Sequence, residues 1–158
     1  LMRVQIIAVG RMRASGPERE MIQDYLKRFD RTGRAMGLGP VSVVEVEDKK
    51  GGGKPAEAAL LLKIVPDGAK VIALDERGKV QTSPVFSQLI ARHRDDGVSD
   101  LCFIIGGADG LDQSVLDRAD SKLSFGQMVW PHMLARVMLS EQLYRAASIL
   151  AGSPYHRV

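Results

Sequence analysis

Short runs of apolar residues alternate with longer segments of mixed polarity along nearly the whole chain. Valine and isoleucine are frequent in the first four of these runs, which is typical of strands buried in a parallel sheet. The runs occupy residues 4–9, 41–46, 70–75, 101–105 and 122–125. Because helical segments separate them, the pattern predicts an α/β fold, with a mostly parallel sheet and helices on both faces.

The intervals between the strands carry signals for the starts and ends of helices. One helix is expected to begin near Pro17, where proline and acidic residues suit a first turn, and to end near Gly33. Thr82 or Ser83, before Pro84, predicts the start of another helix. Further helices are expected over 56–64, 112–118 and 131–150.

Length and composition favour one globular domain, expected over residues 1–158. Hydrophobic residues make up 45% of the chain and charged residues 26%. The apolar runs are far shorter than the ~20 residues of a membrane-spanning helix, and no signal-peptide pattern is visible. The one cysteine, Cys102, lies in an apolar run and predicts a buried thiol. We therefore expect a cytoplasmic protein without a membrane partner.

Ligands of parallel α/β sheets bind at the carboxyl ends of the strands, and two segments of this chain are expected to lie at such ends. Residues 74–78 close the third strand, and residues 76–79 are expected to turn out of it. Residues 106–110, Gly-Gly-Ala-Asp-Gly, follow the fourth strand. Glycines there allow close approach of a ligand to the backbone, although a tight structural turn explains them equally well.

The expected last helix is apolar on nearly every side, which predicts burial in the molecule or at a subunit interface. It nevertheless carries three charged residues, Arg136, Glu141 and Arg145. Glu141 and Arg145 are four residues apart and predict an ion pair. Arg136 needs another partner, because an unpaired charge on so apolar a helix is costly.

Two histidines near the C-terminus are candidate functional residues. His132 belongs to the first turn of the last helix, where the helix dipole favours a neutral ring; a structural hydrogen bond accounts for it equally well. His156 lies between Tyr155 and Arg157, which groups an aromatic ring, a titratable ring and a cation. The histidine spacing does not match a metal site, so we expect no metal.

The net charge of +3 permits an anionic partner without requiring one. Residues 47–55 are rich in lysine and glycine and predict a mobile loop, either a solvated connector or a basic flap over a phosphate backbone. The candidates for contact with phosphate, each equally well explained as a solvated surface residue, are Arg11, Arg13, Lys49, Lys50 and Lys54.

Four segments of the C-terminal third form a specific set of motifs. They are GGADGL at 106–111, SFGQMVWPH at 124–132, RVMLSEQLYRA at 136–146 and PYHR at 154–157. Together with residues 2–10 and 74–79, they resemble the RlmH family of SPOUT-class methyltransferases over the whole chain. The resemblance implies transfer of a methyl group from S-adenosylmethionine to N3 of a pseudouridine in 23S ribosomal RNA on the assembled ribosome.

The resemblance also implies a homodimer and a SPOUT-type fold with a C-terminal trefoil knot, which periodicity would not predict because true knots are almost absent from proteins. The strand end and the knot loops would hold the cofactor. The residues concerned are Leu74, Gly106, Gly107, Gly126, Gln127, Met128, Val129, Trp130 and Pro131.

Methylation at N3 requires removal of a proton, and it places negative charge on the two flanking carbonyl oxygens. We expect His132 or His156 to accept the proton. Arg136 or Arg145 is expected to face the oxygens. Tyr155 would stack on the base. The tail of one protomer, which ends in Tyr155, His156 and Arg157, would complete the site of the other.

Two other functions stay open at this point. A non-catalytic module would bind RNA or the ribosome without binding the cofactor. A SPOUT methyltransferase for another target, such as transfer RNA, would share the same motifs. An ordinary Rossmann-type methyltransferase fits less well, because its glycine motif lies early in the chain and here the glycines lie late.

Overall fold

A five-stranded sheet in the order β2-β1-β4-β3-β5 forms the centre of the structure, which is a computed structural model that describes residues 1–157. Every neighbouring pair of strands in this sheet is parallel. The strands are β1 (Met2–Val9), β2 (Leu38–Val46), β3 (Lys70–Val80), β4 (Asp100–Ile105) and β5 (Ser121–Ser124). This sheet confirms the expected fold class. The trefoil knot stays a prediction, because strand order does not test it.

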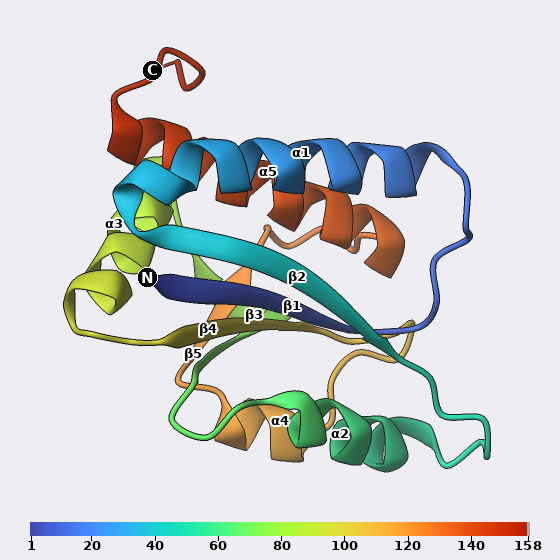
Figure 1. Cartoon of the computed structure of the whole chain (residues 1–158). Helices are drawn as coiled ribbons and strands as arrows, with labels where there is room; N and C mark the ends of the chain where they lie inside the picture. Colours follow the sequence, from blue (N-terminus) through green and yellow to red (C-terminus); the bar gives the residue numbers. More distant parts are fainter. Residues whose placement is uncertain (158) are drawn as a thin grey trace.

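Helices cover both faces of the sheet (Figure 1). One face carries α1 (Pro17–Gly33), α3 (Ser83–Asp95) and α5 (His132–Ala151), and the other carries α2 (Gly53–Ile64) and α4 (Gln113–Arg118). A short 3-10 helix, η1 (Arg34–Met36), joins α1 to β2. None of the helices in the described part of the chain is long and apolar enough to cross a membrane.

Two apolar layers attach the helices to the sheet, because successive residues of a strand point to opposite faces. In β1, Ile6 belongs to the layer under α1, α3 and α5, whereas Ile7 belongs to the layer above α2 and α4. Phe103 and Cys102 divide in the same way in β4. Cys102 is fully buried, and burial raises the pKa of its thiol to about 11, which confirms the expected buried thiol.

Strand β3 continues to Val80, so the expected turn at residues 76–79 was wrong. Leu74 and Lys79 both pair with Leu123 of β5, and residues 75–78 between them form a bulge. Gly78 permits this bulge, because a Cβ there would lie 2.8 Å from the carbonyl carbon of Lys122. The polar composition of the segment suits a bulge at a strand end as well as a turn.

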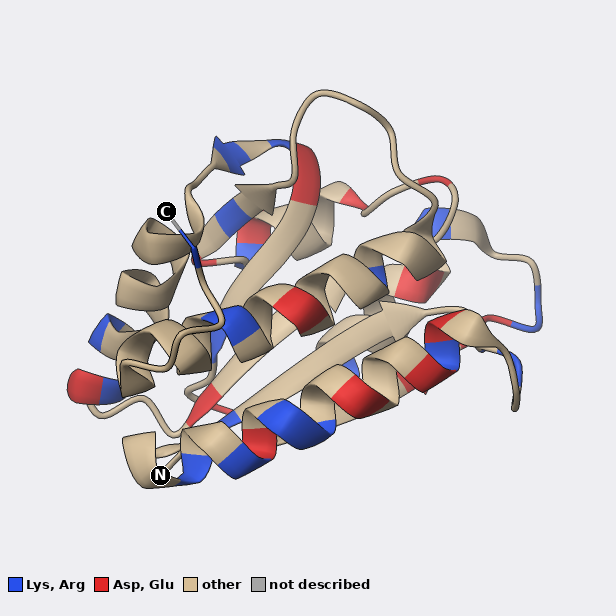
Figure 2. Ribbon diagram, turned by 90° about the horizontal axis from the view of Figure 1, so that it is seen from above, with Lys and Arg blue, Asp and Glu red and all other residues tan. Residues whose placement is uncertain are grey.

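The last helix packs against both α1 and α3, and one of its sides faces outward. Val137, Leu139 and Leu143 are buried, whereas Leu134 is 38% exposed. Figure 2 shows α1 with charged residues along its outer side, while α5 behind it carries few. The expected burial of α5 within one chain is therefore confirmed for the side that packs against α1 and α3, and not for its outward side.

Candidate active site

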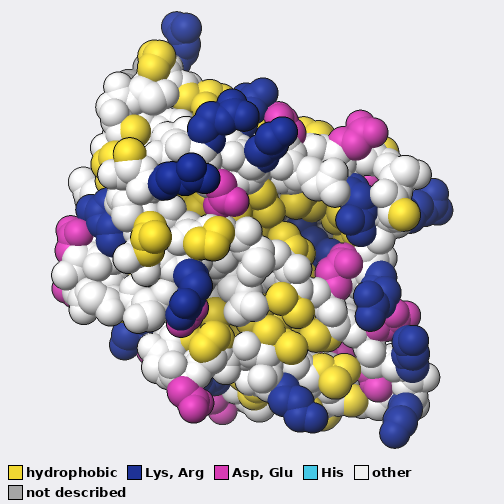
Figure 3. Space-filling view, viewed as in Figure 1, with side chains coloured by type: hydrophobic (Ala, Val, Ile, Leu, Met, Phe, Trp, Pro, Cys, Tyr) yellow, Lys and Arg dark blue, Asp and Glu magenta, His cyan; other side chains and the backbone are white. Residues whose placement is uncertain are grey.

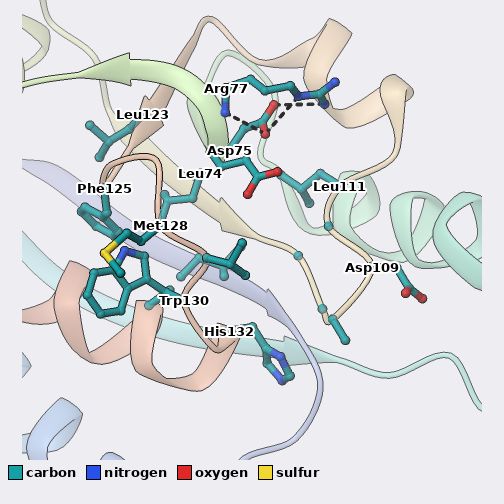
Figure 4. A pocket seen from close by; sticks show the side chains of 18 of the residues that line it. Leu74, Asp75, Arg77, Asp109, Leu111, Leu123, Phe125, Met128, Trp130 and His132 are labelled. Atoms are coloured by element: carbon teal, nitrogen blue, oxygen red, sulfur yellow. Dashed lines mark hydrogen bonds and ion pairs between the residues drawn. The ribbon is translucent and has the colours of Figure 1, made fainter.

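A cavity of about 450 Å³ opens at the carboxyl end of the sheet (Figure 4). Its walls come from the β3 bulge, from the turn after β4 and from the segment between β5 and α5. Lys54, near the start of α2, adds a cation at its edge. Two segments were expected from the sequence to lie at the carboxyl ends of strands, 74–78 and 106–110. Both contribute to this lining.

The glycine turn after β4 is folded tightly on itself. The amide of Gly110 donates to the carbonyl of Gly107 at 3.1 Å. A Cβ at Gly106 would lie 2.7 Å from the backbone of Gly110, so no larger residue fits without displacing the turn. Asp112 then caps α4 by accepting from the amide of Ser114 at 3.1 Å. The turn has a structural need for glycine and also lines the cavity.

The loop from Gly126 to Pro131 presents apolar side chains to solvent at the cavity. Met128 is 75% exposed and Val129 82%. The loop is held at its start by Ser124, whose hydroxyl donates to the carbonyl of Glu76 at 3.0 Å and accepts from the amide of Gly126 at 3.1 Å. Exposed apolar groups beside a cavity are typical of a binding surface for a ligand or a partner.

Seven of the nine residues expected to hold a cofactor line this cavity. They are Leu74, Gly106, Gly107, Gly126, Met128, Val129 and Trp130. Gln127 and Pro131 belong to the same loop and do not contribute to the lining. The lining also includes Phe125, which belongs to the motif at 124–132 but was not among the expected cofactor residues, and Ala135, which lies in none of the motifs.

Acidic and basic groups share the rim of the cavity. Figure 4 shows Phe125, Met128 and Trp130 on one side, across from Asp75, Arg77 and Asp109. The guanidinium of Arg77 donates to the carboxylate of Asp75 at 3.3 Å, and it is itself mostly exposed. The cavity therefore combines an apolar wall with a charged wall.

His132 begins α5 and lines the cavity in a half-buried position. Figure 4 places its ring at the lower edge of the cavity, beyond Trp130. A Cβ added to Gly10, at the end of β1, would lie 3.8 Å from Nε2 of His132. The imidazole thus lies between the cavity and the carboxyl end of β1.

Arg136 lies one helical turn after His132 and is 2% exposed. It forms a salt bridge with Glu45 of β2 at 2.5 Å, and it donates to the carbonyls of Val9 at 2.9 Å and Gly10 at 2.7 Å. Burial alone would raise the pKa of Glu45, but the Met12 amide and Arg136 outweigh it and hold that pKa below its usual value. Glu45 is therefore the partner that was expected for the charge of Arg136 on this apolar helix.

The remaining expected catalytic residues form a second group farther along α5. Arg145 pairs with Glu141 at 2.7 Å, which confirms the expected ion pair. The Tyr155 hydroxyl donates to Glu141 at 2.6 Å, and the tyrosine ring lies 4.6 Å from that of Tyr144. Burial and the negative charge of Glu141 raise the pKa of Tyr155, so its phenol stays neutral. Nη1 of Arg145 lies 3.1 Å from Nδ1 of His156.

The two groups are well separated within one chain. Arg145 follows His132 by thirteen positions in α5, which corresponds to about 20 Å at ~1.5 Å per residue. Arg157 is exposed at the end of the tail. The chain alone therefore places His132 at the cavity and places Arg145, Tyr155, His156 and Arg157 elsewhere.

Comparison with known proteins identifies the family. The chain matches a family described as predicted SPOUT methyltransferase over residues 2–156. It is 68% identical over 157 residues to ribosomal RNA large subunit methyltransferase H of Dinoroseobacter shibae, covering 99% of this chain and 100% of the relative. The protein of that name from Ruegeria pomeroyi is 66% identical, with the same coverage.

A solved structure agrees with the fold. A probable methylase family protein from Haemophilus influenzae superposes with a TM-score of 0.53 at 13% identity, covering 99% of this chain and 71% of that protein. This likeness concerns the fold alone. The family match and the full-length relatives carry the assignment, and the chain belongs to the RlmH family of SPOUT methyltransferases.

Proposed function

We propose that this methyltransferase transfers a methyl group from S-adenosylmethionine to N3 of a pseudouridine in 23S ribosomal RNA of the assembled ribosome. One observation carries the proposal: a cavity of about 450 Å³, lined by most of the residues that the family resemblance assigns to the cofactor, lies at the carboxyl end of the sheet. Pockets for small ligands usually measure about 300–1,000 Å³. The ribosomal RNA target is supported by the names of the full-length relatives.

The lining suits S-adenosylmethionine chemically. Leu74, Met128 and Trp130 offer apolar surface to an adenine ring. Asp75 and Glu76 add carboxylates near a ligand that carries positive charge on its sulfonium and amino groups. Bound there, S-adenosylmethionine supplies an electrophilic methyl group; the protein's task is to orient the base and to manage its proton.

His132 is the better of the two candidates for accepting the N3 proton. Its ring lines the cavity, as a general base must. In His156, Nδ1 faces a guanidinium, which can only donate, so the ring proton belongs on Nε2. His156 in this arrangement therefore offers a hydrogen-bond donor to a substrate. Of the two arginines expected to face the carbonyl oxygens of the base, Arg145 remains the candidate, since Arg136 is buried and paired with Glu45. Arg157 in the exposed tail adds a second cation.

A second copy of the chain would bring the tail to His132. Both groups of residues are needed at one base, and about 20 Å along α5 separates them within a protomer. Exposed hydrophobic side chains on four elements offer an apolar surface for such a copy. They are Met21 of α1, Val80 at the end of β3, Val85 of α3 and Leu134 of α5. We propose a homodimer in which each tail, with Tyr155 placed to stack on the base, completes the partner's cavity.

Cofactor titration and a methylation assay test this function together. Calorimetry of the purified protein should show binding of S-adenosylmethionine. Ribosomes from a strain that lacks the enzyme should gain one methyl group per 23S RNA, at a pseudouridine located by mass mapping. RNA binding without cofactor binding would instead support a non-catalytic module. Methylation of transfer RNA and not of ribosomes would overturn the proposed target.

A further inference from the structure

A partly buried ion pair joins three elements beside the cavity. Glu45 belongs to β2, Arg136 to α5, and the carbonyls of Val9 and Gly10 to the end of β1. We propose that Glu45 and Arg136 are positioning residues that fix the imidazole of His132 at the mouth of the cavity. The proposal rests on the role suggested above for His132 as the proton acceptor.

The pair connects to His132 through the helix and through Gly10. His132 and Arg136 are four residues apart in α5, so their side chains share one face of the helix. Gly10 has a φ of +96°, and a Cβ added there would lie 3.8 Å both from Nη2 of Arg136 and from Nε2 of His132. The backbone of Gly10 is therefore in reach of both side chains, and Arg136 holds it by its carbonyl at 2.7 Å.

Glu45 also holds the loop that follows β1. Its Oε2 accepts from the amide of Met12 at 2.8 Å as well as from Arg136. Arg19 donates to the carbonyl of Arg13 at 2.6 Å and to that of Met12 at 3.2 Å, which fastens the same loop to α1. Glu45 thus sets both the path of residues 10–13 and the position of the guanidinium.

The surroundings of the pair explain why one variant can disturb it. Glu45 and Arg136 line a groove of about 340 Å³ between α1 and β2. Figure 3 shows hydrophobic side chains gathered in a hollow on this face of the molecule. Among the described residues nothing pairs with Nε of Arg136, so its other nitrogens carry all of its hydrogen bonds. Without the Glu45 charge, Arg136 loses its one ion-pair partner among the described residues, and a buried guanidinium without a counter-ion shifts toward water.

The test compares Glu45→Gln with a matched control, Asp100→Asn. Asp100 also pairs with an arginine, Arg3, at 2.8 Å, but at the amino end of the sheet. The first measurement is the NMR signal of the His132 ring, assigned by its loss in His132→Asn. We expect Glu45→Gln to move this signal and Asp100→Asn to leave it in place. Because this measurement needs no substrate, it decides the positioning even if the proposed methyl transfer fails.

The second measurement is single-turnover methylation at saturating cofactor. Glu45→Gln should slow the reaction by about 10- to 100-fold, since a displacement of about 1 Å can cost that much, and should leave the dissociation constant of the cofactor within about twofold. In the His132→Asn background, Glu45→Gln should add almost nothing, because its effect acts through that ring.

Two results would overturn the proposal. One is an unchanged His132 signal in a folded Glu45→Gln protein. The other is a full additional loss of rate when Glu45→Gln is combined with His132→Asn. If Glu45→Gln does not fold, Glu45→Asp keeps the charge and shortens the side chain, and the same two measurements apply to it with the same expected and contrary results.

Discussion

The guanidinium of Arg145 faces Nδ1 of His156 at 3.1 Å and fixes how that ring can act. Arginine has no acceptor, so Nδ1 accepts and Nε2 carries the proton. The same guanidinium lies 4.7 Å from the centre of the Tyr155 ring. In the tail, His156 is thus arranged to donate a hydrogen bond and Tyr155 to stack on a base. The imidazole of His132 at the cavity is then the remaining candidate to accept the proton.

Replacing each histidine separately distinguishes these roles. We expect His132→Asn to slow single-turnover methylation by about 10²- to 10⁴-fold, the usual effect of losing a general base. His156→Asn keeps an acceptor for Arg145 and an amide donor, and it should cost less than about tenfold. Rates are measured at saturating cofactor, with calorimetry to confirm unchanged cofactor binding. Equal losses in the two variants would contradict the assignment of the proton acceptor.

Mixing two inactive variants tests whether the tail serves a partner. Half of the dimers in an equal mixture of His132→Asn and Arg157→Ala are mixed, and each mixed dimer has one site with both residues intact. Activity should therefore return to about a quarter of the wild-type value. If each tail completed its own cavity, no mixture could restore activity. Light scattering on the same samples gives the oligomeric state.

Two neighbouring glycines should differ sharply in their tolerance of a methyl group. A Cβ at Gly106 would lie 2.7 Å from the Gly110 backbone, whereas a Cβ at Gly107 would lie 3.2 Å from Cγ1 of Val9, a side chain that can shift. Gly106→Ala should lower the free energy of unfolding by about 1–3 kcal/mol and weaken cofactor binding. Gly107→Ala should cost less stability. Urea unfolding and cofactor titration measure both effects, and equal destabilisation by the two variants would refute this account of the turn.

Local patterns were sufficient to predict the layers of the fold and the edge at which the cavity opens. Continuous apolar runs identified β1 and β4, because strands buried in a parallel sheet are apolar on both faces. The cap at Thr82 was also visible, and its hydroxyl does accept from the Val85 amide at 3.3 Å. Such signals depend on residues a few positions apart.

Features that depend on distant partners were not visible. Residues 75–78 stay within a strand because the backbone of β5 lies beside them, and nothing in their own composition indicates this. Arg136 clearly needed a partner, but Glu45 is 91 residues away in the sequence. One signal could have pointed to it: Glu45 is the only charged residue in an otherwise apolar stretch at 43–46.

The partly buried carboxylate of Glu45 predicts a definite dependence of stability on pH. Its pKa is lowered in the folded protein, so the stabilisation it gives is present above the ordinary value of 4.5 and is lost as the pH falls through the lowered one. Glu45→Gln should therefore lower the free energy of unfolding most near neutral pH, by roughly 1–3 kcal/mol. The difference from wild type should shrink as the pH falls below 4.5 and through the lowered pKa, as measured by urea unfolding from neutral to acidic pH. If the difference in the free energy of unfolding between wild type and Glu45→Gln grew as the pH falls, this prediction would be contradicted.

Lys54, in the first turn of α2, offers a test of whether the lysine-rich segment 47–55 contacts RNA. It is exposed and lies at the rim of the cavity, whereas Lys63 is exposed at the other end of the same helix. A lysine that neutralises one phosphate releases a counter-ion, so Lys54→Gln should weaken RNA binding and reduce the slope of log affinity against log salt by about one. Lys63→Gln should change neither quantity. Binding measured between about 50 and 200 mM salt checks this, and identical slopes for wild type and Lys54→Gln would make the segment a solvated connector.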